Sequence, residues 1–260
     1  MDKNLETLEY KIDEPVAIID LNRPGKLNSL SRQMSEEMQY LLNIMKYDER
    51  VKAIVLEGRG QSFCAGADLE ERIKADPEPE AKYKFYSGTK ELVRAFINVD
   101  KPVIALLHGW VIGGGALLAL HCDLRVAAED TKFWIPELRF GSLILGGVIK
   151  VLPRIVGVGR AKQILFEAEP IDAVRAKEWG LYNEVVPINK LQETGIEMAK
   201  KISIIPHLTL KLTRELMELG TELSLDGFLK NEPSAATVST SRKEHADDLK
   251  KHFQKARKEK

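Results

Sequence analysis

The chain has 260 residues, and its 39 Lys and Arg residues are balanced by 39 Asp and Glu residues, so the formal net charge is zero. This balance argues against a protein dedicated to nucleic acid or to a membrane surface, because both functions favour a basic excess. No apolar run is long enough to span a bilayer, and the acidic N-terminus lacks the features of a targeting peptide. Cys64 and Cys122 lack metal-ligand spacing, which predicts a cytoplasmic protein with reduced thiols and no metal.

Short apolar runs alternate with helical patterns through most of the chain. The first run, at residues 16–21, precedes Ser31, which is placed to cap a helix. The apolar positions expected on one face of that helix are Met34, Met38, Leu41 and Met45. Further buried strands are expected at residues 53–58, 102–109, 123–128 and 183–187. Strands that alternate with helices predict right-handed crossovers and a mainly parallel sheet, which is an α/β fold.

Two segments depart from this alternation. The stretch 74–84 is rich in proline and charge and predicts an exposed, mobile flap. From about residue 190 the strand patterns stop, and a helical face follows that consists of Leu208, Leu212, Leu216 and Leu219. The sequence therefore predicts an α/β core over residues 1–190 and a helical region over residues 191–260.

A glycine triplet, residues 113–115, separates a predicted strand from a predicted helix. Glycines at such a turn let the backbone approach a ligand, and the first N–H groups of a helix point outward at its positive end, so an anion or oxyanion site is one interpretation. A lone triplet more often serves tight packing of strand against helix. The loop around Gly66 offers a second such turn, and two loops together could supply two backbone donors to one oxyanion.

Glu137 is the candidate acid or base. It follows Phe133, Trp134, Ile135 and Pro136, and burial in this apolar setting would raise the pKa of its carboxyl. A solvated loop glutamate is the alternative. The five histidines have no metal-ligand spacing, and no serine lies in a G-x-S-x-G turn, so the sequence supports neither a metal centre nor a covalent hydrolase.

Five segments in order along the chain resemble the crotonase family, the enoyl-CoA hydratases and isomerases. They are "NRPGKLNSL" (22–30), "SFCAGADL" (62–69), residues 101–133, "PELRFG" (136–141) and residues 154–187. The resemblance implies a crotonase-like spiral of repeated β-β-α units with a mainly parallel sheet, followed by a C-terminal helical region. It also implies an acyl-CoA site in the core over residues 1–190.

The resemblance also assigns roles to individual residues. In the family, two backbone N–H groups hold the thioester carbonyl of an acyl-CoA, and these map onto Ala67 and Gly114. The positions implied at the mouth for the CoA adenine and phosphates are Lys26, Leu27, Ala65, Asp68 and Leu69. Apolar walls are expected from Ile112, Leu117, Trp134 and Leu143. Coenzyme A is part of the substrate, so no separate cofactor is expected.

One position departs from the family pattern. Hydratases of the family hold a water between two glutamates, which here correspond to Leu117 and Glu137, so one acid is missing. A single base can carry a proton between two carbons of an enoyl thioester, which favours an isomerase, with a single-glutamate hydratase close behind. A non-catalytic acyl-CoA-binding member is a third hypothesis. RNA binding is disfavoured because no basic and aromatic stripe is present.

The resemblance implies a homotrimer or a hexamer of two trimers, with the region 191–260 serving trimer packing. The last 19 residues, 242–260, contain eight basic and four acidic residues. The family brings an aromatic and a basic residue of this segment to the CoA adenine and phosphates, which implies Phe253 with Lys255 or Arg257. By composition alone, a solvated charged helix is the alternative.

Overall fold

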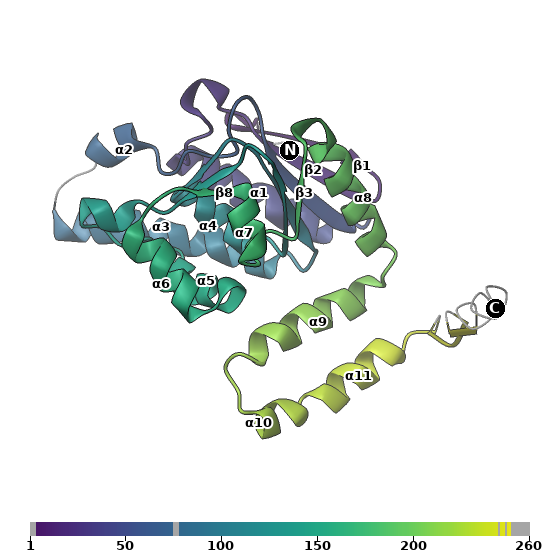
Figure 1. Cartoon of the computed structure of the whole chain (residues 1–260). Coiled ribbons are helices and arrows are strands. Elements are labelled where there is room, and N and C mark those ends of the chain that lie inside the picture. Colours follow the sequence, from purple (N-terminus) through teal and green to yellow (C-terminus); the bar gives the residue numbers. More distant parts are fainter. Residues whose placement is uncertain (1–3, 75–77, 244, 248, 251–260) are drawn as a thin grey trace. The chain divides into compact units, whose positions relative to one another are not determined.

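The computed structural model of the chain describes residues 4–74, 78–243, 245–247 and 249–250 (Figure 1). The chain divides into two units, Met1–Ile204 and Ile205–Lys260. The sequence places this division at residue 190, but α8 (Leu191–Ser203) packs on the strands of the first unit. The helical pattern that follows the last strand therefore begins inside the core rather than after it.

Within the described residues, the main sheet of the first unit has the order β1-β2-β3-β4-β6-β9. The strands are β1 (Leu8–Asp13), β2 (Val16–Leu21), β3 (Ala53–Gly58), β4 (Val103–Leu107), β6 (Leu124–Ala128) and β9 (Glu184–Val186). β1 and β2 form an antiparallel pair, and all the other neighbours run parallel. A smaller sheet contains β5 (Trp110–Ile112), β7 (Lys132–Trp134) and β8 (Ile171–Asp172).

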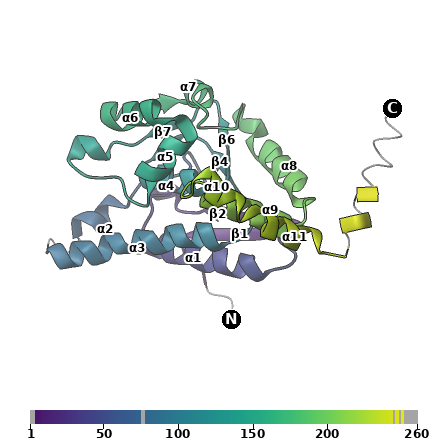
Figure 2. The same cartoon turned by 90° about the horizontal axis from the view of Figure 1, so that it is seen from below.

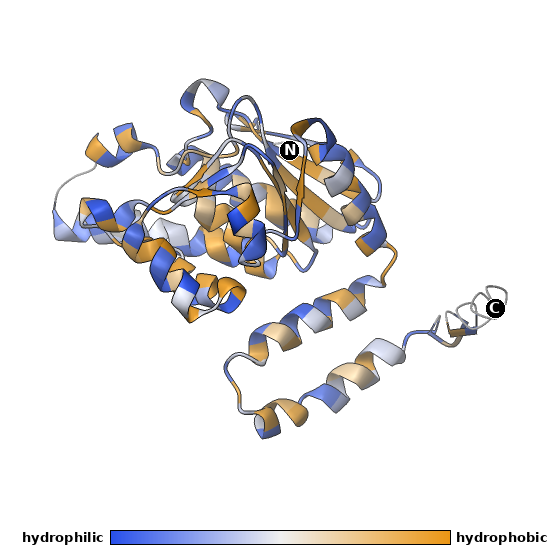
Figure 3. Cartoon of the chain, viewed as in Figure 1, coloured by the Kyte–Doolittle hydropathy of each residue, from blue (hydrophilic) through white to orange (hydrophobic). Residues whose placement is uncertain are grey.

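Helices cover both faces of the main sheet, which is why its central strands are mostly apolar. The α8 face buries Val16 and Ile18 of β2, and the opposite face buries Ala17 and Ile19. Figure 3 shows these central strands as the most hydrophobic part of the unit. On the opposite face, α1 (Arg32–Tyr47) and α3 (Pro79–Asn98) lie side by side (Figure 2).

Most of the predicted elements are confirmed. The strands at 16–21 and 53–58 have the predicted bounds, and Ser31 caps α1 by accepting a hydrogen bond from Met34 N at 3.1 Å. All four apolar positions predicted for the inner face of α1 are buried. The loop predicted over 74–84 is wrong for residues 79–84, because α3 begins at Pro79, whose fixed φ and missing N–H suit a first helical position.

The remaining helices of the first unit position the site or close the core. They are α2 (Leu69–Lys74), α4 (Gly114–His121), α5 (Val148–Val156), α6 (Val158–Glu167) and α7 (Ala173–Glu178). Short 3₁₀ turns occur at η1 (Pro24–Lys26), η2 (Glu137–Phe140) and η3 (Ile188–Lys190). Several of these elements begin within the segments quoted above, namely η1, α2, α4, η2, α6 and α7, so many motif residues lie at loop-to-helix junctions.

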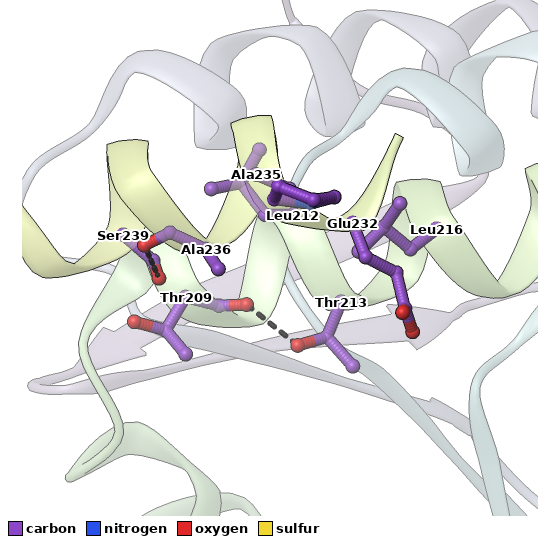
Figure 4. Close-up of a pocket in the computed structure, with 9 residues that line it drawn as sticks. Thr209, Leu212, Thr213, Leu216, Glu232, Ala235, Ala236 and Ser239 are labelled. Atoms are coloured by element: carbon purple, nitrogen blue, oxygen red, sulfur yellow. Dashed lines mark hydrogen bonds between the residues drawn. The ribbon is translucent and has the colours of Figure 1, made fainter. Parts of the chain in front are cut away.

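The second unit is helical. Its described helices are α9 (His207–Leu219), α10 (Leu225–Leu229) and α11 (Glu232–Thr240). α9 and α11 lie side by side, with a groove between them of about 440 Å³ (Figure 4). Leu212 and Leu216 of the predicted apolar face line this groove, together with Thr209 and Ala236. Two of the four residues of the predicted helical face therefore lie between these two helices.

Candidate functional site

The loop after β3 is held between two neighbouring chain segments. On one side, Leu30 N donates to Gly66 O at 2.7 Å, and Asp68 N donates to Leu30 O at 3.1 Å. On the other side, Ile112 N donates to Cys64 O at 3.0 Å. These bonds hold the loop against β5, the strand that leads into the glycine triplet.

Each glycine of the triplet meets a different part of the site. A side chain at Gly113, whose φ is +45°, would collide with Oε1 of Glu137. A Cβ at Gly114 would lie 3.3 Å from the backbone nitrogen of Ala67, and one at Gly115 would collide with the preceding loop. Tight packing, the alternative interpretation of the triplet, therefore applies to Gly115, whereas Gly113 and Gly114 make room for a carboxyl group and an amide.

The amides of Ala67 and Gly114 lie close together and have no acceptor. Within the part of the chain that the structure describes, neither N–H donates a hydrogen bond to a backbone or side-chain atom. Gly114 is the first residue of α4, so its N–H has no partner inside the helix and lies at the positive end of the helix dipole. Two unpaired donors at one place form an arrangement that can bind an oxyanion.

Glu137 lies over this glycine turn. It is the first residue of η2, and Pro136 precedes it. Its Oε2 atom is buried and has no hydrogen-bond partner among the described residues. Burial raises the pKa of Glu137, against the opposing effects of its own backbone and of the Arg72 charge. The expected raised pKa is confirmed, and the carboxyl group is well suited to accept and return a proton.

Leu117 lies one turn along α4 from the triplet and is 2% exposed. Its side chain packs so closely on Gly146 that a Cβ there would collide with it, and the same Cβ position lies 3.3 Å from the Thr89 methyl group of α3. His121 Nε2 lies 2.6 Å from Gly146 O and ties this loop to α4. The position that would carry a second acid is therefore an apolar contact.

A sequence model of the enoyl-CoA hydratase/isomerase family matches residues 11–258. The chain belongs to this family. It is 33% identical over 241 residues to the short-chain-enoyl-CoA hydratase of Clostridium acetobutylicum, covering 92% of each protein. It is 32% identical over 233 residues to the crotonyl-CoA hydratase of Syntrophomonas wolfei, covering 88% of each. The crystal structure of an enoyl-CoA hydratase from Bacillus anthracis superposes with a TM-score of 0.91 at 32% identity, covering 96% of this chain and 97% of the other. The protein is thus an enzyme of the enoyl-CoA hydratase/isomerase family with the crotonase fold.

Both of the family's motif loops expected at the CoA mouth lie together in the structure. Ala65 N donates to Leu27 O at 2.9 Å, and Lys26 Nζ lies 2.5 Å from a carboxylate oxygen of Glu70. Leu27 and Leu69 are both exposed. The structure thus brings these predicted residues to one surface, and their contact with CoA stays a prediction.

Asp68 has a structural task that the motif alone does not reveal. Its Oδ2 accepts a hydrogen bond from Arg23 at 2.9 Å, and its Oδ1 accepts from Glu70 N at 3.1 Å at the start of α2. The side chain is 8% exposed. Asp68 therefore joins the loop that carries Ala67 to the η1 turn, besides any contact with substrate.

The four predicted apolar wall residues differ in their surroundings. Ile112 and Trp134 are paired neighbours on β5 and β7, but the Trp134 indole donates to Ala168 O at 2.6 Å. Leu143 is 69% exposed and lies on the surface of the loop after η2. Leu117 is the predicted wall residue that the structure places against this loop. Phe253, Lys255 and Arg257 lie outside the described residues.

Sequence reasoning missed two groups that shape the site. Asn28 is fully buried, and its side chain donates to Arg59 O and Ser62 O, both at 2.8 Å, while it accepts from Arg23 N. The second asparagine of the N-R-P-x-x-x-N motif was the available signal. Arg72 is the other missed group, and nothing in its local sequence distinguishes it from a solvated helix cation.

Among residues 4–74, 78–243, 245–247 and 249–250, no three His, Cys, Asp or Glu side chains converge as a metal site. Over the same ranges, no helix is long and apolar enough to cross a membrane.

Proposed function

We propose that this enzyme is an enoyl-CoA isomerase in which one carboxyl group, that of Glu137, moves a proton between two carbons of the acyl chain. The observation that carries the proposal is the unpaired, buried Oε2 of Glu137 beside a site whose second acid position is the apolar Leu117. Hydration requires a water to be held and deprotonated while C2 receives a proton, which two carboxyl groups do more readily than one.

The proposed reaction starts with the thioester carbonyl of a 3-enoyl-CoA at the amides of Ala67 and Gly114. The Glu137 carboxylate removes a proton from C2, and the electron pair of that C–H bond joins the conjugated system. Negative charge develops on the thioester oxygen, where the two N–H groups stabilise it by a few kcal/mol each. The same carboxyl group then gives the proton to C4, and the double bond moves from C3–C4 to C2–C3.

The balance of this reaction requires no oxidant, reductant or metal, so coenzyme A within the substrate is the only cofactor-like group that we propose. The raised pKa of Glu137 supports the proposal, because a base of higher proton affinity removes a carbon-bound proton more readily.

A single-glutamate hydratase is the second candidate. The relatives at 33% and 32% identity are named as hydratases, which favours it. In that case backbone groups near Glu137 would have to position the water. A non-catalytic acyl-CoA-binding protein is the third candidate, and the buried carboxyl group argues against it, because a binder gains nothing from the desolvation of an acid.

The experiment offers the purified protein 3-hexenoyl-CoA and 2-hexenoyl-CoA separately and follows thioester absorbance, with the products identified by mass. The isomerase proposal expects conversion of the first compound to the second and little addition of water. Rapid formation of 3-hydroxyhexanoyl-CoA from the second compound would replace the proposal with the hydratase. Binding of both compounds without turnover would leave the acyl-CoA-binding protein.

The assembly and location that go with this proposal are a cytoplasmic homotrimer, or a hexamer of two trimers, in which Phe253 and Lys255 or Arg257 contact CoA. The surplus of basic residues in 242–260 supports the contact, since CoA carries several phosphate charges. Light scattering measures the assembly. Deletion of residues 250–260 should weaken CoA binding and make the remaining affinity less sensitive to salt, and unchanged affinity and salt response would leave a solvated tail.

A further inference from the structure

Arg72 on α2 is a half-buried cation for which the described residues supply no acidic partner. Its Nη2 donates to Ser142 Oγ at 3.1 Å, and its guanidinium lies 6.0 Å from the centre of the Tyr86 ring of α3. Among the described residues, no Asp or Glu forms an ion pair with it. A guanidinium has five N–H donors, and among the described residues Ser142 Oγ is the acceptor of Arg72.

A chain of contacts connects Arg72 to the proposed base. Ser142, which accepts from Arg72, donates its backbone N–H to Glu137 O at 3.0 Å. The Arg72 charge also acts on the Glu137 carboxyl group, because it lowers the pKa that burial raises. Arg72 thus lies on the same side of the site as Glu137.

A second chain of contacts connects Arg72 to the apolar position on α4. Tyr86, under the guanidinium, is one turn before Thr89 on α3. The Thr89 methyl group and the Leu117 side chain both flank Gly146. Arg72, Glu137 and Leu117 lie on three different elements, and all three contact the loop between η2 and α5, which contains Ser142 and Gly146.

The apolar side chains near Arg72 and Ser142 in the sequence offer no reason for a cation at this place. Ile73 and Leu69 of α2 are largely exposed, and so is Leu143, which follows Ser142 directly. A side chain that only held α2 in place could be apolar here, since its neighbours offer apolar surface. An unpaired guanidinium with a hydroxyl beside it is instead the arrangement that binds a carboxylate, often through two parallel hydrogen bonds.

We propose that Arg72 and Ser142 bind a carboxylate at the far end of the acyl group, so that this site prefers CoA thioesters of dicarboxylic acids to those of monocarboxylic acids. The inference rests on the proposed function in one respect, which is that the thioester end lies at Ala67 and Gly114. The acyl chain then extends past Glu137 toward α2. The Ser142 hydroxyl, which now accepts from Arg72, can turn to donate to the bound carboxylate.

The test measures binding of thioesters that cannot react, so it does not depend on catalysis. The probes are succinyl-, glutaryl- and adipyl-CoA, each paired with the monocarboxylic thioester of equal carbon number: butyryl-, pentanoyl- and hexanoyl-CoA. We expect at least one dicarboxylic thioester to bind the unaltered protein about 10-fold or more tightly than its pair, the scale of a charge-assisted hydrogen bond. Arg72→Met should abolish this preference and leave the affinity for the monocarboxylic thioesters within about 3-fold.

Lys74→Met is the matched control, because it removes another cation from α2 and should keep the preference. Arg72→Lys keeps the charge without the two parallel donors of the guanidinium, so it should retain part of the preference for dicarboxylic thioesters. Equal affinities within all three pairs for the unaltered protein would overturn the proposal, as would a preference that survives Arg72→Met. Failure of the proposed isomerase would appear separately, as absence of turnover of 3-hexenoyl-CoA with the binding preference intact.

Discussion

Two buried acid sites of the first unit differ in what surrounds them. Glu137 stands at the glycine turn, whereas Asp20 and Glu57 stand as register partners on β2 and β3. In both places burial raises a carboxyl pKa, that of Glu57 to about 7, with the neighbouring Asp20 as a second cause. In both places one buried oxygen lacks a hydrogen-bond partner among the described residues, Oε2 of Glu137 and Oδ1 of Asp20.

The site formed by Asp20 and Glu57 is held by contacts with other side chains of the first unit. Asp20 accepts from Arg59 at 2.8 Å, and Glu57 accepts from Gln192 of α8 at 2.8 Å. Glu9 of β1 pairs with Asp20 across the strand. This site therefore joins α8 to β3 of the main sheet. A raised pKa alone does not identify a catalytic acid, and the proposal for Glu137 rests in addition on the two neighbouring amides of Ala67 and Gly114.

The largest expected difference between the two sites is in turnover. Glu137→Gln should keep acyl-CoA binding and lower turnover of 3-hexenoyl-CoA by about two or more orders of magnitude, the scale for loss of a general base. Glu57→Gln is the matched control, because it alters the other raised carboxyl group and should change turnover by less than about 2-fold. Near-normal turnover by Glu137→Gln would remove this residue from the mechanism.

A smaller loss is expected when the Glu137 carboxyl group is displaced rather than removed. In Gly113→Ala the new Cβ would collide with Glu137 Oε1 at a backbone φ of +45°, so turnover should fall by up to about 10²-fold. Gly159→Ala in α6 is the control, since nothing lies within 4 Å of its Cβ and its stability should stay equal or rise slightly. Kinetics and thermal unfolding measure both variants, and equal turnover in the two would contradict the close approach of Glu137.

Leu117→Glu would give Glu137 the paired neighbour that Glu57 already has. Water addition to 2-hexenoyl-CoA should rise roughly 10-fold above the unaltered protein, less than a fully positioned acid–base pair supplies. The new carboxyl group is buried and should lower the free energy of unfolding, so circular dichroism must first establish that the variant is folded. A folded variant without any gain in hydration would mean that Thr89 and Gly146 leave no space for the water.

The smallest effect is on stability at the second site. Because the folded-state pKa of Glu57 is about 7 against an ordinary 4.5, the folded protein keeps a proton that the unfolded chain releases. The stability contributed by this proton is complete below about pH 4.5 and is lost as pH rises through 7. Between pH 5 and 8, the free energy of unfolding measured in urea should fall by about 1–2 kcal/mol more in the unaltered protein than in Glu57→Gln. Parallel pH curves for the two proteins would contradict this account.

The parts of the fold that could be predicted are those whose burial is visible in the sequence. The first four residues of β2 and of β3 are buried and apolar, so each strand appears in the sequence as an apolar run. β1 is mostly exposed, and β5, β7 and β8 have three residues or fewer, so none of them carries a usable pattern. The sequence divides the chain at residue 190, whereas the structure divides it after Ile204. The difference arises because an amphipathic helix has the same sequence pattern whether it covers a sheet or another helix.

The same distinction applies to the site. Ala67, Gly114 and Glu137 lie in motifs whose spacing is local, so the sequence resemblance could single out all three, and their roles stay predictions. Arg72 meets Ser142 across 70 residues and Gln192 meets Glu57 across 135, so only the folded chain brings these pairs together. Long-range polar contacts of this kind leave no periodicity for sequence reasoning to detect.

Transfer of a labelled proton within one substrate molecule tests the central claim most directly. The experiment supplies 3-hexenoyl-CoA carrying two deuterium atoms at C2 in ordinary water and measures deuterium at C4 of the product at the earliest times. A single carboxyl group that removes and returns the proton predicts deuterium at C4 with the unaltered protein and a rate of its appearance lower by about two orders of magnitude with Glu137→Gln. Product that carries no deuterium at C4 from the first turnovers, or equal transfer by both proteins, would contradict the account.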